Sequence, residues 1–472
     1  MKTNDANSLF GFRLPEDFLI GTANSAFQSE GAWDRDGKTP SIMDHFAKLY
    51  AGKFPEARKK VGSAGGAPQP NSEDLTDRGC FFYDNYEAYI EDMAKTGQNA
   101  YRLSLSWPRI IPQGVGEVNP KGIAFYNKVI DKLLSHGITP FVDLYHWDLP
   151  MAIFEKGGFE NPEFPAWFEA YAKVCFEAFG DRVKLWSTFN ETQISIRAGY
   201  LSGRFPPYLT DRMRSNLAGH HVILAHFRAV RVYRSMGLDG KIGIVHCLSP
   251  AAPVELTEEN LAAVGRNMAF QLEWWLQPMV SGKYPEHLLE YAAEMRDTMP
   301  PDYQTQLDEW FAPMDFLGLN YYIFGRTAVT RENLLGFKGA QSFYSEPGQA
   351  YAPYPAGLMD TVQYAAELCP GMDLYITENG CCLPNINDEE KECDDPERIT
   401  YLREHLRMAA RCVRAGYPLK GYFYWNDADS YEIQDGYRLR FGLTWVDHKT
   451  GRRRWKKSRH YFSNICKTHM ID

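Results

Sequence analysis

Two glutamates each follow a short apolar segment, a position in which they could carry out acid–base or nucleophilic chemistry. Glu191 ends the segment Leu185 to Glu191, and Glu378 lies near the end of the segment Leu374 to Gly380. A single glutamate is usually a solvated surface residue, but the end of an apolar strand favours burial. Two buried carboxyl groups facing one pocket are what cleavage of a glycosidic bond needs, one as an acid and one as a nucleophile or base.

Further polar and aromatic residues stand at the ends of other predicted strands. In chain order they are Gln28, Arg102, His146, Trp147, Asn190, Asn320, Tyr322, Asn379, Trp425, Asp427 and Asp429. If the strands form a parallel barrel, the loops at their carboxyl ends converge on one mouth. These residues are therefore candidates for an active site.

No other arrangement of residues competes with the two glutamates. The sequence has no G-x-S-x-G, H-E-x-x-H or G-x-x-x-x-G-K-[ST] motif, and no G-x-G-x-x-G after a strand. His220, His221 and His226 have a helical spacing that could bind a metal. They fall inside a helical pattern from Asn216 to Tyr233, away from any predicted strand end, which favours a structural role. We expect neither a metal nor a cofactor.

The elements that must position these residues are short strands that alternate with amphipathic helices. Apolar residues three or four apart predict a helix from Ile123 to Leu134 that ends before Gly137. A second helical stripe runs from Phe164 to Phe179. Asn161 and Pro162 are expected to be its N-cap and its first helical residue.

The full pattern predicts eight strands. They are Phe18 to Phe27, Ala100 to Trp107, Pro140 to Trp147, Leu185 to Glu191, Lys241 to Leu248, Phe316 to Tyr322, Leu374 to Gly380 and Gly421 to Asn426. Eight strands alternating with helices predict an α/β fold, a single (β/α)8 TIM barrel with long βα loops. We expect residues 1–472 to form this one domain, although length alone would allow three. Residues 48–79 and 327–355 are expected to be long insertions.

The composition is that of a folded globular protein, with 44% apolar residues. The 51 lysines and arginines against 60 aspartates and glutamates give a net charge of −9, which argues against nucleic acid or an anionic membrane as a partner. The first residues lack the apolar core of a signal peptide, so we expect a cytoplasmic protein. Nine well-spread cysteines favour neither a disulfide framework nor a zinc site. A homo-oligomer is left open.

Several segments, spread in order along almost the whole chain, carry a family pattern. The sequence resembles glycoside hydrolase family 1, the β-glucosidase family, at residues 18–32, 101–110, 144–150, 188–191, 316–322, 376–380 and 440–443. The resemblance implies a barrel enzyme that hydrolyses O-glycosides. Its partner would be a small-molecule β-glycoside or an oligosaccharide.

The resemblance also implies roles for individual residues. Glu191 of T-F-N-E matches the acid/base and Glu378 of I-T-E-N-G matches the nucleophile, which implies a two-step retaining mechanism with the two carboxyls about 5 to 5.5 Å apart. Arg102, Tyr322 and Asn320 would support the nucleophile. The residues that match the sugar-binding pocket are Gln28, His146, Trp147, Asn190, Trp425 and Glu432.

The chain departs from the family pattern after the last predicted strand. Ile433 stands where the family usually has a tryptophan, whose indole N–H donates to a sugar hydroxyl. Losing one such hydrogen bond costs about 1 kcal/mol. The sugar-binding pocket is therefore expected to be altered, and a plain glucoside need not be the best substrate.

Other functions stay open on the sequence. The chain could prefer another glycone, such as a galactoside, fucoside or glucuronide, or it could be a transglycosidase. A 6-phospho-β-glycosidase is disfavoured because Glu432, Asp427 and Asp429 would form an acidic loop that repels phosphate. An inactive sugar-binding protein is disfavoured because both Glu191 and Glu378 are present.

Overall fold

Eight parallel strands form a closed barrel in the computed structural model, which describes residues 12–46, 79–291, 297–333, 335–340, 353–433 and 436–472. The barrel strands are β2 (Leu19–Asn24), β3 (Ala100–Ser104), β4 (Thr139–Asp143), β5 (Leu185–Asn190), β6 (Lys241–Cys247), β8 (Phe316–Asn320), β11 (Asp373–Asn379) and β13 (Leu419–Trp425). They follow one another around the ring in chain order, and β13 closes it by pairing with β2. The predicted (β/α)8 barrel is confirmed.

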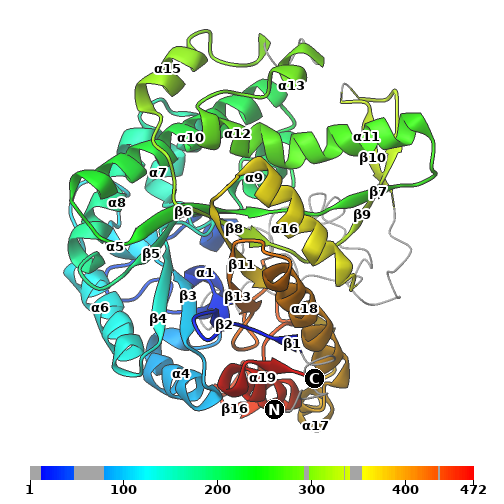
Figure 1. The fold of residues 1–472 in the computed structure, drawn as a ribbon. Coiled ribbons are helices and arrows are strands. Elements are labelled where there is room, and N and C mark those ends of the chain that lie inside the picture. The colour runs from blue at the N-terminus through cyan, green and yellow to red at the C-terminus, as the bar shows by residue number, and fades with distance from the viewer. Residues whose placement is uncertain (1–11, 47–78, 292–296, 334, 341–352, 434–435) are drawn as a thin grey trace, which may run out of the picture.

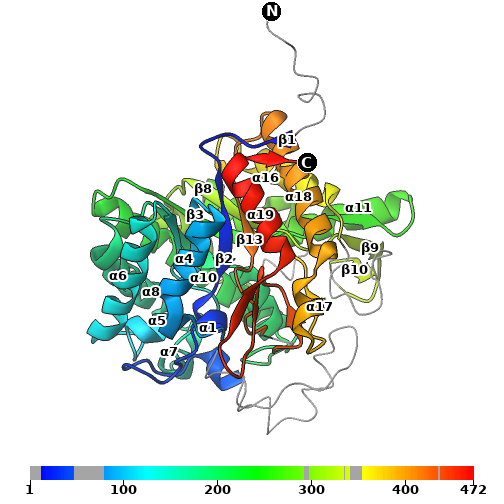
Figure 2. The ribbon, with the colours of Figure 1, turned by 90° about the horizontal axis from the view of Figure 1, so that it is seen from below.

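Helices surround the strands, with α6 and α8 on one side and α16 and α18 on the opposite side (Figure 1; Figure 2 gives a second view). The longer helices are α4 (Phe82–Thr96), α6 (Pro120–Ser135), α8 (Phe164–Phe179), α10 (Arg212–Ser235), α11 (Glu258–Met268), α16 (Ala356–Leu368), α18 (Pro396–Arg414) and α19 (Lys457–Thr468). The shorter ones are α1 (Ala26–Ser29), α5 (Trp107–Ile110), α7 (Met151–Glu155), η3 (Gly158–Glu160), α9 (Thr192–Ile196), η4 (Arg197–Leu201), η5 (Ala269–Glu273), α12 (Trp274–Ser281), α13 (Glu286–Tyr291), α15 (Tyr303–Trp310) and α17 (Glu389–Cys393). None of the helices in the described ranges is both long and apolar enough to cross a membrane.

Aromatic side chains fill part of the barrel interior. The ring of Phe141 lies edge-on to Phe316, Tyr375 and Phe423, with centroids 5.2, 5.7 and 5.5 Å away. These four rings come from β4, β8, β11 and β13, and all four residues are buried. Edge-to-face contacts of this kind stabilise an interior beyond the area that they bury. This part of the barrel is a packed core, so polar chemistry belongs elsewhere along the strands.

The start of α8 differs from the prediction. The helix begins at Phe164 with Glu163 as its N-cap residue, so Asn161 and Pro162 lie before it. The Asn161 side chain accepts a hydrogen bond from the backbone N–H of Glu163 at 2.8 Å. Asn161 thus shapes a turn that leads into the helix. Pro165 occupies the first turn, where a missing N–H costs nothing.

The predicted first strand is also too long. It ends at Asn24, and Gln28 lies on the short helix α1. The predicted insertion 327–355 includes most of β9 (Gly325–Val329) and all of β10 (Phe337–Ala340), which form a small sheet with β7 (Ala251–Pro253). Almost all of the 48–79 insertion lies outside the described residues.

Short strand pairs complete the fold. They are β1 (Phe12–Arg13) with β17 (Met470–Ile471), β12 (Leu383–Pro384) with β14 (Leu439–Arg440), and β15 (Thr444–Val446) with β16 (Arg453–Trp455). The first of these pairs joins residues from the two ends of the chain, and the N–H of Leu14 also donates to the carbonyl of His469 at 3.0 Å.

Candidate active site

The two glutamates lie at the carboxyl ends of their strands, as predicted. Glu191 follows β5 directly and Glu378 is the penultimate residue of β11. Glu378 is buried, with 4% of its surface exposed, whereas Glu191 is half-buried. The backbone of Glu191 has a φ of 48°, in the left-handed region that is costly for a residue with a side chain. Such conformations concentrate at functional sites.

Two donors hold the carboxylate of Glu378. Arg102 Nη1 donates to its Oε1 at 2.7 Å, and the Tyr322 hydroxyl donates to its Oε2 at 2.7 Å. Burial, followed by the charge of Glu378, raises the pKa of Tyr322 well above its ordinary value. Tyr322 therefore keeps its proton and remains a donor. Charge-assisted hydrogen bonds to both oxygens stabilise the negative charge of Glu378 and fix its orientation.

Glu191 has the opposite environment. Burial raises its pKa from 4.5 to about 8, and the neighbouring charge of Glu378 acts in the same direction. Asn320 Nδ2 donates to its Oε1 at 2.8 Å, and the thiol of Cys247 also hydrogen-bonds to it. Among the described residues, no lysine or arginine forms an ion pair with Glu191. At neutral pH its carboxyl group holds a proton that it can donate.

A chain of amide groups connects the two glutamates. Asn190 Oδ1 accepts from Arg102 Nη2 at 2.6 Å and from Asn320 Nδ2 at 3.0 Å. Asn320 in turn accepts from the hydroxyl of Thr377 at 2.7 Å. Because each of these groups is buried and hydrogen-bonded, the network fixes the positions of the residues around both carboxyls. Arg102, Asn190, Asn320 and Tyr322 are thus brought together with the glutamates.

The residues expected to bind sugar lie around this centre. The rings of His146 and Trp425 stack with centroids 5.6 Å apart, and His146 Nε2 lies 3.0 Å from Asn190 Nδ2. Across the site, Gln28 Nε2 donates to the carbonyl of Tyr431 at 2.8 Å and contacts Glu432 Oε2 at 3.4 Å. A flat ring and a set of amide and carboxylate groups are the features that bind a sugar.

Trp147, which is also predicted to bind sugar, forms a hydrogen bond within the protein. Its indole N–H donates to the backbone carbonyl of Asn190 at 3.0 Å, and its φ is 77°. The N–H is therefore occupied within the protein. This hydrogen bond helps to fix the end of β5, which carries Asn190. The ring of Trp147 packs against Phe205 with centroids 5.5 Å apart.

Comparison with protein families identifies the family of enzymes in which this arrangement of residues occurs. The model of glycosyl hydrolase family 1 matches residues 11–471. The chain belongs to glycosyl hydrolase family 1.

Relatives within this family agree along the whole chain. Beta-glucosidase A of Thermotoga maritima is 37% identical over 461 residues, which cover 98% of this chain and 99% of that protein. The solved structure of the family 1 β-glucosidase from Thermotoga maritima superposes with a TM-score of 0.90 at 36% identity, covering 98% of this chain and 100% of that one. A 6-phospho-beta-glucosidase of Bacillus subtilis is 34% identical over 96% of this chain and 98% of its own length. This family 1 chain is a glycoside hydrolase.

The loop after β13 is less acidic in effect than the sequence of this family 1 enzyme predicts. Asp427 Oδ1 lies 3.1 Å from Arg459, and Asp429 lies 2.7 Å from Lys456 Nζ and 2.9 Å from Arg440 Nη1. Both aspartates are buried and paired with cations, so they exert little repulsion on an anion at the site. The argument against a phosphorylated sugar therefore rests on Glu432 alone.

Ile433 is half-buried beside Glu432 and packs against the main hydrophobic core. Its aliphatic side chain offers no hydrogen-bond donor.

Two residues of the site were missed on the sequence. Asp143, at the end of β4, lies 2.6 Å from Arg102 Nη2, so the guanidinium is held between Asp143 and Glu378. The signal was available, since Asp143 interrupts an otherwise apolar strand. Cys247, beside Glu191, could not be recognised in this way, because a cysteine at the end of an apolar strand is expected to be a residue of the hydrophobic core.

The three histidines considered for metal binding have other contacts. His220 Nδ1 lies 3.0 Å from the Tyr284 hydroxyl, His221 Nδ1 lies 2.8 Å from the carbonyl of Phe159, and His226 Nδ1 lies 2.8 Å from the Thr188 hydroxyl. Within the described ranges no group of three or more His, Cys, Asp or Glu residues is placed to hold a metal ion. The nine cysteines are all free thiols.

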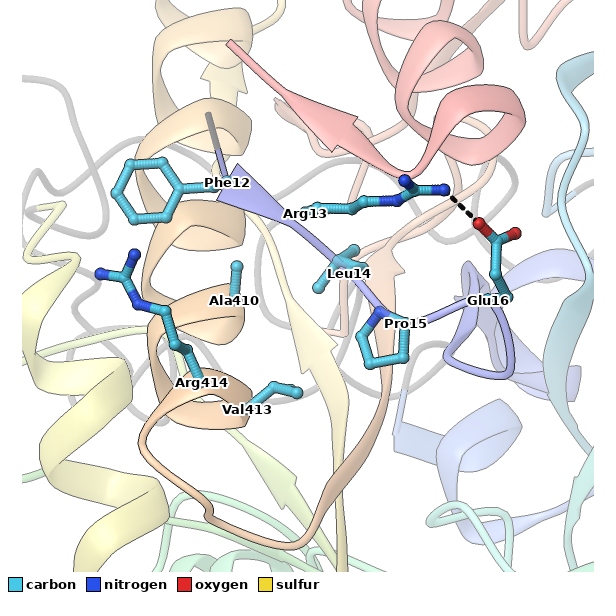
Figure 3. Close-up of a pocket in the computed structure, with 8 residues that line it drawn as sticks. All are labelled: Phe12, Arg13, Leu14, Pro15, Glu16, Ala410, Val413 and Arg414. Atoms are coloured by element: carbon cyan, nitrogen blue, oxygen red, sulfur yellow. Dashed lines mark hydrogen bonds and ion pairs between the residues drawn. The ribbon is translucent and has the colours of Figure 1, made fainter. Parts of the chain in front are cut away.

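A surface cavity lies away from the glutamates, between β1 and α18 (Figure 3). Phe12 and Arg414 line it, and the guanidiniums of Arg407, Arg411 and Arg414 lie 5.7, 5.3 and 5.6 Å from the Phe12 ring. The cavity is at the end of α18 that leads into the start of β13. It is therefore on the face opposite the carboxyl ends of the strands. Residues on that face of a barrel contribute to stability rather than to catalysis.

Proposed function

We propose that this chain is a retaining β-glycosidase that acts on β-glucoside-like O-glycosides. The observation that carries the proposal is the contrast between the two glutamates. Glu378 is held by Arg102 and Tyr322, whereas Glu191 has its pKa raised to about 8 by burial. One carboxyl group is thus prepared to attack and the other to give a proton, which is the division of roles in a retaining enzyme.

In the first step, a carboxylate oxygen of Glu378 attacks the anomeric carbon while the bond to the leaving oxygen breaks. Glu191 transfers its proton to that oxygen, so the aglycone leaves as a neutral alcohol. The product is a glycosyl ester of Glu378. Arg102 and Tyr322 keep Glu378 in place before the attack and stabilise the carboxylate when it is released.

In the second step, Glu191 acts as a base. Its carboxylate takes a proton from water, whose oxygen attacks the same anomeric carbon and releases Glu378. Two inversions at one carbon leave the β-configuration unchanged. The raised pKa of Glu191 suits both steps, because a group that titrates near neutral pH can give and take a proton efficiently.

Trp425, Gln28 and Glu432 support a glycone site of this type. The Trp425 ring offers an apolar face for a pyranose, and Gln28 and Glu432 lie within 3.4 Å of each other, a pairing able to share sugar hydroxyls. The β-glucosidase from Thermotoga maritima has been solved in complex with glucoimidazole and with deoxynojirimycin, at 37% identity to this chain. We propose that a β-linked glucose-like sugar occupies the same place here.

The test is hydrolysis of 4-nitrophenyl β-D-glucoside with the released sugar followed by proton NMR. The β-anomer is expected to appear first and to mutarotate later. Glu378→Gln is expected to lose activity by several orders of magnitude, because no covalent intermediate forms. Initial release of the α-anomer, or full activity of Glu378→Gln, would contradict the proposal. A finding of sugar binding without turnover would favour an inactive binding protein instead.

The identity of the glycone is a separate proposal that rests on Ile433. Because Ile433 removes a hydrogen-bond donor from the chain, we infer a shift away from strict glucoside preference. The test compares aryl β-glucosides, galactosides, fucosides and glucuronides on the wild type and on Ile433→Trp. A gain of about fivefold or more for glucoside in kcat/KM is expected from one added hydrogen bond. Met470→Trp, a change on the opposite face, is the control, and an unchanged ranking would contradict the inference.

A 6-phospho-β-glycoside is the second candidate substrate. It is favoured by the salt bridges of Asp427 and Asp429 and by a Bacillus subtilis relative named as a 6-phospho-beta-glucosidase. The same aryl glucoside with and without a 6-phosphate separates the two. Faster turnover of the phosphorylated form would replace the first proposal. Addition of an alcohol acceptor, with product analysis, measures the share of transglycosylation.

A further inference from the structure

A small cavity lies where helix α10 meets η4, η5 and α12, which are the segments that follow α9 and α11. Its volume is about 10 Å³, which is room for one group the size of a water molecule or a monatomic ion. The cavity shares no residue with the site around Glu191 and Glu378. None of the described residues that line it is acidic.

Two arginines line this cavity. Neither Arg197 nor Arg212 forms an ion pair or a side-chain hydrogen bond with any residue in the described ranges, and the Nη1 atom of Arg212 is buried there without a partner. The guanidinium carbon of Arg197 lies 5.2 Å from the centroid of the Phe270 ring. An aromatic face holds a cation in place without neutralising its charge. The cavity therefore carries an uncompensated positive charge.

The acidic groups of the adjoining elements are engaged elsewhere. Glu160 of η3 accepts from Arg214 Nε and Nη2 at 2.6 and 2.8 Å. Asp211, the N-cap residue of α10, accepts from the backbone N–H of Arg214 at 3.1 Å. Glu273 of η5 accepts from the Tyr364 hydroxyl at 2.7 Å. None of these three carboxylates forms an ion pair with an arginine of the cavity.

Further hydrogen-bond donors surround the cavity. The indole Nε1 of Trp275 is buried and has no partner among the residues that the structure describes. Its ring is fixed between α12 and α10 (Figure 1), since a Cβ atom added to Gly219 would lie 2.8 Å from Cη2 of Trp275. Ser215 contributes a hydroxyl group, and Arg212 is the first residue of α10, at the positive end of that helix.

The donors and the volume together select the kind of ligand. A guanidinium and an indole N–H donate hydrogen bonds and accept none, so the ligand must be an acceptor. A negative charge on that ligand is favoured, because two part-buried guanidiniums otherwise stay unpaired. A carboxylate or a phosphate has several heavy atoms and is too large for a cavity of about 10 Å³. A monatomic anion satisfies both conditions.

We propose that Arg197 and Arg212 bind a single chloride ion in this cavity, with the indole N–H of Trp275 as a further donor. The ion joins η4 and α10 to η5 and α12. Because α9 starts directly after Glu191 and continues into η4, the ion also helps to fix the helix that follows this glutamate. The inference is independent of the proposed function, since no step of that reaction uses the ion.

Crystals of the protein soaked in sodium bromide test the site directly, because bromide replaces chloride and can be located by its anomalous scattering. The expected result is an anomalous peak within hydrogen-bonding distance of Arg197, Arg212 and Trp275 Nε1. Crystals of Arg197→Met prepared in the same way are expected to lack this peak. Bromide at surface arginines only, or a water molecule in the cavity, overturns the proposal.

Thermal unfolding tests the same site in solution. The Tm is measured in sodium chloride and in sodium gluconate at equal ionic strength, because gluconate is too large for the cavity. At a chloride concentration about fifty times Kd, the Tm of the wild type is expected to be about 2 °C higher than in gluconate. Arg197→Met and Arg212→Met are expected to lose this difference.

The variants are expected to fold, since each removes a charge that has no partner in the chloride-free protein. In gluconate the Tm of Arg197→Met is therefore expected to equal or exceed that of the wild type. If Arg197→Met does not fold, Arg212→Met gives the same comparison.

Arg35→Met is the control, because Arg35 pairs with Asp84 where both side chains are 50% exposed. This variant is expected to keep the full response to chloride. A wild type that does not respond to chloride overturns the proposal, and so does an equal response in the wild type and in Arg197→Met.

Discussion

Glu191 and Glu378 are the same residue type, and the difference between them comes from what surrounds each carboxyl group. Glu378 accepts hydrogen bonds from a guanidinium and a phenol, whereas Glu191 accepts from the neutral amide of Asn320. Neutral donors compensate a buried negative charge less than a cation does. The chemistry of the pair is therefore set by Arg102, Tyr322 and Asn320 as much as by the glutamates.

The raised pKa of Glu191 predicts the alkaline side of the pH profile. Its carboxyl must be protonated to act as an acid, and it loses its proton as pH rises through about 8. The value of kcat/KM is therefore expected to fall about tenfold per pH unit above that point. Initial rates on an aryl glucoside measure this.

Glu191→Gln provides the matched control for that profile. With an activated leaving group such as 2,4-dinitrophenol, the variant retains glycosylation activity, and the limb near pH 8 is expected to disappear. A limb that persists in Glu191→Gln would assign the titration to another group.

Arg102 is predicted to be a large contributor to stability. It pairs with both Asp143 and Glu378, and all three side chains are buried. Arg102→Met leaves two buried carboxylates without their cation, so the free energy of unfolding is expected to fall by about 3–5 kcal/mol. Urea unfolding followed by tryptophan fluorescence measures it.

Arg35→Met is the control for Arg102→Met, since Arg35 pairs with Asp84 where both side chains are 50% exposed. An exposed pair contributes about 0–1 kcal/mol. Equal losses in the two variants would show that burial of the Arg102 pair is irrelevant.

For single residues, the sequence predicted which side chains gather at the site but not all of the contacts between them. Residues that end strands were found because strand ends converge in a barrel. The use of the Trp147 indole N–H by the Asn190 carbonyl could not be predicted, because it depends on a left-handed backbone at Trp147. The pairing of Asp427 and Asp429 with cations likewise requires Arg459 and Lys456, which come from far along the chain.

At the scale of elements, close approach of backbones fixes the strand ends that carry the site. A Cβ atom added to Gly380 would lie 2.0 Å from the carbonyl oxygen of Trp425. Gly380 follows Glu378 closely in the chain, and Trp425 ends β13. These two strand ends can therefore be adjacent only because position 380 has no side chain.

Gly380→Ala is expected to push the ends of β11 and β13 apart. Activity is expected to fall by at least tenfold, with a lower Tm, because both Glu378 and Trp425 move. Gly265→Ala in helix α11 is the control, since nothing lies within 4 Å of its added Cβ. That change is expected to raise stability by about 0.5–1 kcal/mol. Wild-type activity in Gly380→Ala would refute the argument.

The strands of the barrel could be predicted because each is a run of buried residues between helical stripes. Their ends were less certain, as Gln28 shows by lying on α1 rather than on a strand. The β9–β10 pair was missed because its residues alternate weakly and face solvent in part. Local polarity indicates a loop there, and only pairing with β7 makes a sheet.

At the scale of the whole molecule, β1 and β17 hold together segments from opposite ends of the chain. Ile471 is buried with 1% of its surface exposed, while the adjacent Met470 is 41% exposed. Ile471→Ala is expected to lower the free energy of unfolding by about 2–4 kcal/mol through lost burial and a cavity. KM is expected to stay unchanged, since this pair lies on the face opposite the glutamates.

Met470→Ala is the neighbouring control, with an expected change below about 0.5 kcal/mol. Thermal unfolding measures the stability of both variants, and steady-state kinetics measures their KM. A change of KM in Ile471→Ala would show that the two faces of the barrel communicate.

The contact between Arg102 and Glu378 spans the ring. Arg102 is on β3 and Glu378 on β11, and β13 and β2 lie between those strands on the way around the barrel. An incomplete or open sheet could not bring the two side chains within reach. During refolding, catalytic activity is therefore expected to return only when the barrel has closed. Its recovery should be slower than the recovery of the helical circular dichroism signal.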